Sequence, residues 1–167
     1  MIVTTHSGQR FDPLNFEPKN VVLEDIALAL SRLCRFCGHT SVFYSVADHS
    51  CNLAEIAEEA GLDIQHQVAA LFHDAAEAYL GDMISPIKHL EQLWSYRALE
   101  QDYMEKIGFV FGFIESDLAV IKEYDRKLTT REYEQFLLGN PKAVKWVDHP
   151  YQRFLDMART LQAKRFH

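Results

Sequence analysis

The amino-acid sequence predicts an all-α protein, a single domain over residues 1–167 built as a helical bundle of about six helices. From Val22 onward, apolar residues recur with the three-to-four-residue spacing of helices. Glycines and capping residues interrupt this spacing, and short connections favour packed neighbouring helices. With 167 residues, of which 48% are hydrophobic, the chain is long enough to bury one core.

The first half of the chain predicts a hairpin and then three helices. Residues 2–16 alternate loosely around a glycine, which favours a short N-terminal hairpin. Helices are expected between Val22 and Gly38, between Ser45 and Gly61, and between Asp63 and Gly81. Serine and aspartate are good N-caps, and glycine commonly follows a helix C-terminus.

The second half predicts further helices. Ser85-Pro86 favours a helix start, because proline is tolerated at the first helical position. Amphipathic helices are expected over residues 93–107, 116–138 and 151–164, the second ended by Gly139-Asn140-Pro141.

Composition and charge exclude several classes of protein. A net charge of -7 argues against a broad nucleic-acid surface, which needs clustered Lys and Arg. No apolar run approaches the roughly 20 residues that span a bilayer, and no signal peptide is recognised. Three cysteines without such a signal favour a reducing compartment. We therefore expect no nucleic-acid or membrane partner and a cytoplasmic location.

The dipeptide His73-Asp74 is the centre of the candidate site. On a helix, Glu77 follows His73 by four residues and Asp74 by three, so the three side chains would share one face. The dipeptide alone is weak evidence for a metal site, because a core histidine bonded to a neighbouring carboxylate is common.

Two further residues strengthen a metal site. His49, on the preceding predicted helix, can face the dipeptide if the two helices pack antiparallel, and Asp125 lies on the later long helix. Two histidines and two aspartates suit a borderline divalent ion such as Mn²⁺, Co²⁺, Fe²⁺ or Zn²⁺, with Mg²⁺ also open. A rival zinc site would use Cys34-x-x-Cys37 with His49-x-Cys51.

The chain resembles the HD-domain phosphohydrolase superfamily, all-α enzymes with the pattern H…HD…D. The resemblance implies the HD-domain fold, with the pattern at His49, His73-Asp74 and Asp125. The resemblance covers about residues 5–138 and is closest to the 5'-deoxynucleotidase-like branch. That branch has V-x-E/Q-H-S, then H-D-A-x-E, G-D and P-x-K. This chain has Val46-Ala47-Asp48-His49-Ser50, His73-Asp74-Ala75-Ala76-Glu77, Gly81-Asp82 and Pro86-Ile87-Lys88.

Two segments further resemble a phage and prophage subgroup that includes dATP triphosphohydrolases: Cys34-Arg35-Phe36-Cys37-Gly38-His39-Thr40 and Phe43-Tyr44-Ser45. If the chain is phage-encoded, its expected location is the host cytoplasm. This chain departs from its relatives at Asp48, where Glu or Gln is commoner, and at Phe36, where Trp is frequent. The resemblance implies a metal-dependent phosphohydrolase of deoxynucleotides, acting on dATP or, alternatively, on deoxynucleoside 5'-monophosphates. It also implies a homo-oligomer, a dimer or hexamer. A non-catalytic nucleotide-binding module is the third alternative.

Chemistry predicts a role for each remaining candidate. Glu77 is the expected general base or water-orienting group. Asp82 would orient the leaving group or a sugar hydroxyl. Arg35 and Lys88 would contact phosphate, the first through its fork and the second as a point charge. By resemblance, Phe36 would pack on the sugar and exclude a 2'-hydroxyl.

Other candidates are less distinctive. Pro86 belongs to the P-x-K segment and is grouped with the substrate contacts. His39 would reach a phosphate or cap a helix end. Glu132 could brace a substrate cation, although a solvated helix face is the expected environment for such a charge run. The aromatic residues between Trp94 and Phe113 are expected in the core or at a subunit interface.

Overall fold

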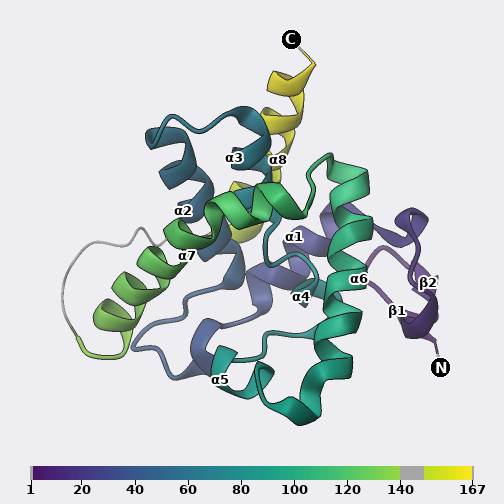
Figure 1. Cartoon of the computed structure of the whole chain (residues 1–167), viewed down its shortest axis with the longest axis horizontal. Helices are drawn as coiled ribbons and strands as arrows, with labels where there is room; N and C mark the ends of the chain where they lie inside the picture. The colour runs from purple at the N-terminus through teal and green to yellow at the C-terminus, as the bar shows by residue number, and fades with distance from the viewer. Residues whose placement is uncertain (1, 140–148, 167) are drawn as a thin grey trace.

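The computed structural model describes residues 2–139 and 149–166, and within them the chain is a helical bundle with one small hairpin (Figure 1). Two four-residue helices, α4 (Glu77–Leu80) and α5 (Ser85–Lys88), lie between longer ones. The predicted all-α class is confirmed. In the described ranges, six helices have nine or more residues: α1 (Leu23–Arg32), α2 (Val46–Glu59), α3 (Ile64–Phe72), α6 (Trp94–Phe111), α7 (Glu115–Phe136) and α8 (Pro150–Arg165).

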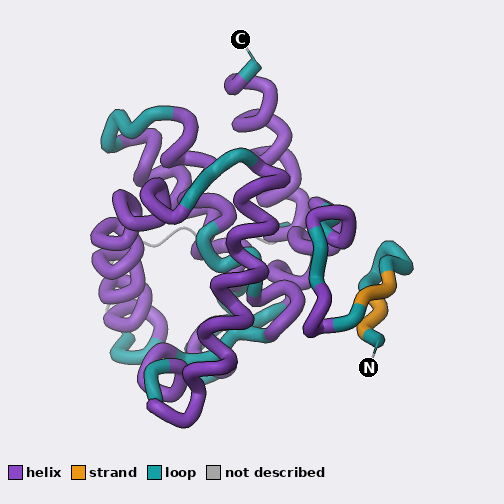
Figure 2. The backbone as a smooth tube through the Cα atoms, turned by 45° about the vertical axis from the view of Figure 1, so that its right-hand side comes forward, coloured by secondary structure: helices purple, strands orange, loops and turns teal. Residues whose placement is uncertain are grey.

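The predicted N-terminal hairpin is present at the edge of the molecule (Figure 2). Strands β1 (Val3–Thr4) and β2 (Arg10–Phe11) pair antiparallel, and Gly8 turns the chain with a φ of +87°. The carboxylate of Asp25 at the start of α1 accepts hydrogen bonds from the Ser7 amide at 2.7 Å and the Ser7 hydroxyl at 2.6 Å. These bonds attach the hairpin to the helical body.

Side-chain caps fix the starts of α2 and α3, as predicted. The Ser45 hydroxyl accepts a hydrogen bond from the amide of Asp48 at 3.0 Å and donates one to the Asp48 carboxylate at 2.6 Å. Asp63 accepts a hydrogen bond from the amide of His66 at 3.0 Å. Such caps satisfy amides that have no partner within the helix. They fix the start of α2, which carries His49, and the start of α3, which ends just before His73.

The predicted continuous helix over residues 63–81 is wrong at its centre. Helix α3 ends at Phe72, residues 73–76 form a turn, and α4 begins at Glu77. The amide of Glu77 donates to the carbonyl oxygen of Asp74 at 3.0 Å, three residues back instead of four. The series of four-residue hydrogen bonds is therefore interrupted at the His-Asp pair by a tighter turn of the 3₁₀ type.

The later helices agree with the predicted ones apart from their ends. Helix α6 continues to Phe111 and stops at Gly112, which adopts a left-handed φ of +80°. Helices α7 and α8 match their predicted spans to within two residues at each end. Of the predicted stop at residues 139–141, Asn140 and Pro141 lie outside the described residues.

Packing around α2 and α3 brings the site together. These two helices pack on each other, α8 contacts both of them and α1, and α7 contacts α2 and α3. At the core, the ring of Phe72 stacks on Phe111 with centroids 4.0 Å apart and meets Phe154 edge to face at 5.5 Å. No helix in the described part of the chain is long and apolar enough to cross a membrane.

Candidate metal centre

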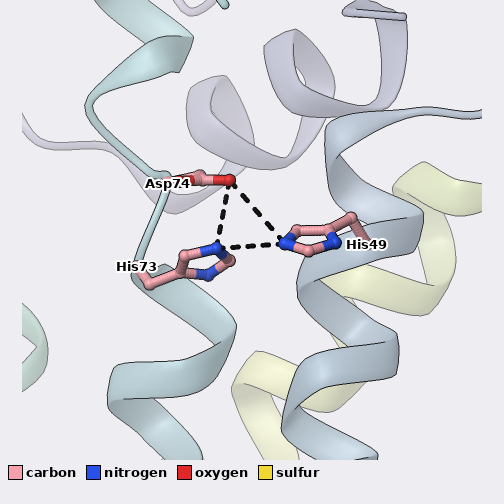
Figure 3. A group of neighbouring side chains, drawn as sticks. All are labelled: His49, His73 and Asp74. Atoms are coloured by element: carbon pink, nitrogen blue, oxygen red, sulfur yellow. Dashed lines mark hydrogen bonds and ion pairs between the residues drawn. The ribbon is translucent and has the colours of Figure 1, made fainter. Parts of the chain in front are cut away.

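Three side chains from two segments converge at the break after α3 (Figure 3). His49 projects from the first half of α2, and His73 and Asp74 stand in the turn. The Nε2 atoms of His49 and His73 are 3.2 Å apart. Asp74 Oδ2 lies 3.1 Å from His73 Nε2 and 4.0 Å from His49 Nε2. One nitrogen from each ring and one carboxylate oxygen thus surround a common point.

Asp125 on α7 brings a fourth ligand atom to this point. Its Oδ1 lies 3.1 Å from His49 Nε2 and 3.8 Å from His73 Nε2. Ligand atoms bonded at about 2.1 Å to one divalent ion are spaced roughly 3 to 4 Å apart in tetrahedral or octahedral geometry. The group whose ligand atoms all lie within 4.8 Å of one another consists of His49, His73 and Asp74. Asp125 approaches both histidine nitrogens, and its place as the fourth ligand stays a prediction.

The Nδ1 atoms of both histidines lie within hydrogen-bond distance of oxygen acceptors. His49 Nδ1 lies 2.7 Å from Glu132 Oε1, and His73 Nδ1 lies 2.8 Å from the carbonyl oxygen of Ala70. A proton on each Nδ1 leaves the Nε2 lone pairs facing each other. Metal-binding histidines are oriented in this way. The two Nε2 atoms, together with the neighbouring carboxylate oxygens, therefore fit a divalent ion.

The electrostatics favour a cation at the same place. Burial acts to raise the pKa of Asp74, but the two imidazoles hold it well below its ordinary value. Burial also acts to raise the pKa of Asp125, yet its hydrogen bond to His49 brings it to about 2. Burial lowers the pKa of His49, but the carboxylates of Glu132 and Asp125 outweigh this and raise it to about 9. The excess of carboxylate over guanidinium charge makes the point between the rings attractive to a cation.

Comparison with known proteins places this site in a family. Residues 38–135 match the family described as 5'-deoxynucleotidase YfbR-like. The chain belongs to this family. It is 37% identical over 99 residues to the uncharacterized protein YfdR of Escherichia coli (strain K12), covering 59% of this chain and 52% of that protein. It is 43% identical over 86 residues to an uncharacterized protein of Rhodobacter capsulatus, covering 49% of this chain and 44% of that protein. The chain thus spans about half the length of these relatives.

The YfbR-like match includes all four candidate ligands but begins after Arg35. The guanidinium of Arg35 lies between two carboxylates: Nη1 is 3.4 Å from Asp74 Oδ2, and Nε is 3.2 Å from Glu132 Oε2. Nη2 donates to the Thr129 hydroxyl at 3.2 Å. Burial lowers the pKa of Arg35, but these carboxylates raise it above its ordinary value. Arg35 therefore braces a ligand, and its predicted contact with phosphate stays a prediction.

Glu77 lies beside the ligands of this YfbR-like site with one unpaired oxygen. Its side chain is buried, and Oε2 has no hydrogen-bond partner among the described residues. Oε1 lies 3.6 Å from Lys88 Nζ, which is itself 2.6 Å from Glu100. Burial and the carboxylates of Asp74 and Asp82 raise the pKa of Glu77 well above its ordinary value. Burial also raises the pKa of Asp82.

Phe36, His39 and Pro86 are the remaining predicted substrate residues. Phe36 is half-buried with a φ of +54°, and its ring centroid lies 5.4 Å from Arg35 Cζ. His39 and Pro86 are exposed, the second at the start of α5. Their contacts with a substrate stay predictions.

The rival zinc site gains no support from the described residues. The group of potential metal ligands found there consists of His49, His73 and Asp74 and contains no cysteine. Cys51 is buried in the core, while Cys37 is exposed. His49 therefore faces the His-Asp pair.

Glu132 is the residue whose place was predicted wrongly. It was expected on a solvated face, but its side chain is fully buried. It accepts the His49 Nδ1 hydrogen bond and pairs with Arg35. A sequence signal existed, since Glu132 follows Asp125 by seven residues, two helical turns on the same face. Burial of α7 against α2, which creates this environment, is not visible in its charged sequence.

A cavity of about 990 Å³ opens beside the ligands. It runs between α6 and the beginning of α7, and His73 and Asp74 contribute to its wall. Lys88, Arg97 and Lys122 supply positive charge to the lining. The lining also contains the carboxylates of Asp74, Glu100, Glu105 and Glu115, so its charge is mixed. The cavity gives a ligand space to reach the candidate metal centre.

Proposed function

We propose that the protein is a metal-dependent phosphohydrolase that acts on deoxynucleotides. The observation that carries this proposal is the pair of Nε2 atoms 3.2 Å apart, flanked by the carboxylates of Asp74 and Asp125. Mixed nitrogen and oxygen donors suit Mn²⁺, Co²⁺, Fe²⁺ or Zn²⁺, with Mg²⁺ as a further candidate. Such an ion, held by these four side chains, would polarise a phosphate oxygen and lower the pKa of water.

Glu77 supplies the proton acceptor in this proposal. Its unpaired Oε2 lies in a buried position next to the ligands, and its raised pKa improves it as a base. The ammonium group of Lys88, 3.6 Å from Oε1, compensates its charge and is placed to meet a phosphate oxygen. Asp82, with its own raised pKa, is suited to orient or protonate the leaving oxygen.

Family membership favours a deoxynucleoside 5'-monophosphate as the substrate, because the family is described as 5'-deoxynucleotidase YfbR-like. A second candidate is dATP. The adjoining cavity of about 990 Å³ favours it, because this space can hold further phosphates beside the ligands. The likeness of residues 34–45 to dATP triphosphohydrolases supports the same candidate.

Phosphate release from a panel of nucleotides tests the proposal. The metal-depleted protein receives Mn²⁺, Co²⁺ or Mg²⁺ and then each dNMP, dNTP, NMP and NTP. Release from dNMPs alone supports the monophosphatase, and release of phosphate, pyrophosphate or triphosphate from dATP supports the second candidate. Equal turnover of ribonucleotides would contradict selection for deoxyribose. Metal binding without turnover of any nucleotide would leave the non-catalytic nucleotide-binding module.

A further inference from the structure

A chain of buried hydrogen bonds leads from His49 on α2 to Arg153 on α8. His49 Nδ1 and the Tyr44 hydroxyl both lie 2.7 Å from Glu132 Oε1. Asn52 Nδ2 donates to the Tyr44 hydroxyl at 2.8 Å, and Arg153 Nη2 donates to Asn52 Oδ1 at 2.8 Å. We call Glu132, Tyr44, Asn52 and Arg153 the His49 relay.

Each bond of the His49 relay determines the direction of the next one. Arg153 can only donate, so it fixes which end of the Asn52 amide is the acceptor. The other end must then donate to Tyr44, whose hydroxyl proton is left for Glu132. The Glu132 carboxylate can only accept, so it takes hydrogen bonds from both the Tyr44 hydroxyl and His49 Nδ1. A guanidinium on α8 thus orients the groups that hold the Glu132 carboxylate against His49.

Burial makes this directional order costly to break. Glu132, Tyr44 and His49 are fully buried, and Asn52 is 5% exposed. Water cannot readily replace a partner lost at such depth, and an unpaired buried polar group is destabilising. Arg153 is also held by Glu55 at 2.8 Å. Both ends of the relay are thereby fixed, one by an ion pair and the other by a candidate ligand.

We infer that Tyr44, Asn52 and Arg153 act with Glu132 as positioning residues for metal binding by His49. Their common effect is to hold the Glu132 carboxylate against His49 Nδ1, so that the ring presents Nε2 to the ion. The inference rests on the metal site of the proposed function. It adds residues on either side of the family-matched histidine, and Arg153 lies outside the matched segment 38–135.

Metal titration of two matched tyrosine variants tests the relay. Tyr44→Phe keeps the ring and removes the hydroxyl. The control is Tyr103→Phe, because Tyr103 is equally buried and its hydroxyl donates to the carbonyl oxygen of Pro13 at 3.0 Å, away from the ligands. Tyr44→Phe should raise the Kd for Mn²⁺ alone about 10-fold. Tyr103→Phe should leave it within about twofold. Melting temperatures of both metal-free variants separate lost stability from lost affinity.

The far end of the relay gives a second comparison on one helix. Arg153→Gln should weaken Mn²⁺ binding several-fold, while Arg159→Gln, which removes a surface ion pair with Glu24, should not. Unchanged Mn²⁺ affinity in both Tyr44→Phe and Arg153→Gln, at lowered melting temperature, would overturn the inference and leave the relay a structural feature.

Nitrogen NMR of the wild-type protein provides a measurement that does not depend on variants that fold poorly. With Zn²⁺ bound, His49 should show a protonated Nδ1 and a metal-bound Nε2. Ligation through Nδ1 would overturn the relay directly. None of these measurements uses turnover. A wild-type protein that binds metal but is inactive would refute the proposed function. The relay would still be supported or overturned by the Mn²⁺ affinities and the NMR spectrum.

Discussion

His49 and His73 present their Nε2 atoms to each other at 3.2 Å, although they come from different helical segments. Each ring is held from behind, His49 by Glu132 and His73 by the carbonyl oxygen of Ala70. Two lone pairs directed at one point are stabilised when a cation lies between them. The relationship therefore links the stability of this part of the fold to metal binding.

Adding a divalent ion should stabilise the metal-depleted protein. A ligand at 100 times its Kd contributes about 2.7 kcal/mol, which corresponds to roughly 5 to 10 °C in Tm for a chain of this size. Thermal unfolding with and without Co²⁺ measures the effect. His73→Ala should lose the increase, and His89→Ala, which changes an exposed histidine after α5, should retain it. Equal increases in both variants would contradict the assigned ligands.

Glu77→Gln should separate catalysis from metal binding. The substitution preserves the shape of the side chain but removes the proton acceptor, so kcat should fall at least about 100-fold. The Kd for Mn²⁺ should change little, because Glu77 is not among the four candidate ligands. Steady-state kinetics on the best nucleotide measure kcat, and a Mn²⁺ titration measures the Kd. The exposed Glu91→Gln variant is the control, and a full rate in Glu77→Gln would remove this residue from the mechanism.

The sequence predicted which side chains meet at the candidate site better than it predicted the backbone that holds them. The apolar pattern of residues 63–81 continues with helical spacing through the site, so a break at residues 73–76 leaves no trace in it. Three-residue and four-residue hydrogen bonds place neighbouring side chains on nearly the same face over one turn. His73 and Asp74 therefore remained recognisable, although the predicted continuous helix was wrong.

Tertiary contacts determine the features that sequence could not supply. Glu132 stands in a strongly charged stretch of α7 and is buried only because α7 packs on α2. Arg35 was predicted as a phosphate contact because of its chemistry, yet its guanidinium lies between Asp74 and Glu132. Such pairings depend on which helices meet, and side-chain spacing within one helix does not encode this.

Replacing Arg35 should destabilise the protein as well as the site. Arg35→Met would leave Asp74 and the buried Glu132 without their guanidinium partner, which typically costs about 3 kcal/mol. Arg35→Lys keeps the positive charge but lacks the planar guanidinium, so the free energy of unfolding should fall by less. Urea unfolding of the metal-depleted proteins measures both changes. Arg32→Met alters an exposed residue at the end of α1 and should stay within about 0.5 kcal/mol of the wild type. A comparable loss in that control would indicate a general effect of removing positive charge.

Phe72 should be the costliest aromatic residue to truncate near the site. It is fully buried and stacks on Phe111 with centroids 4.0 Å apart, at the last position of α3 before His73. Phe72→Ala should lower the free energy of unfolding by about 3 to 5 kcal/mol, because the cavity cannot close completely. Phe166→Ala is the matched control, since Phe166 is 86% exposed and should change stability by no more than about 0.5 kcal/mol. Because Phe72 adjoins the ligand turn, its truncation should also weaken Co²⁺ binding in the fraction that remains folded. Unchanged stability in Phe72→Ala would contradict the packing of α3 against α6 and α8 on which the position of the His-Asp turn depends.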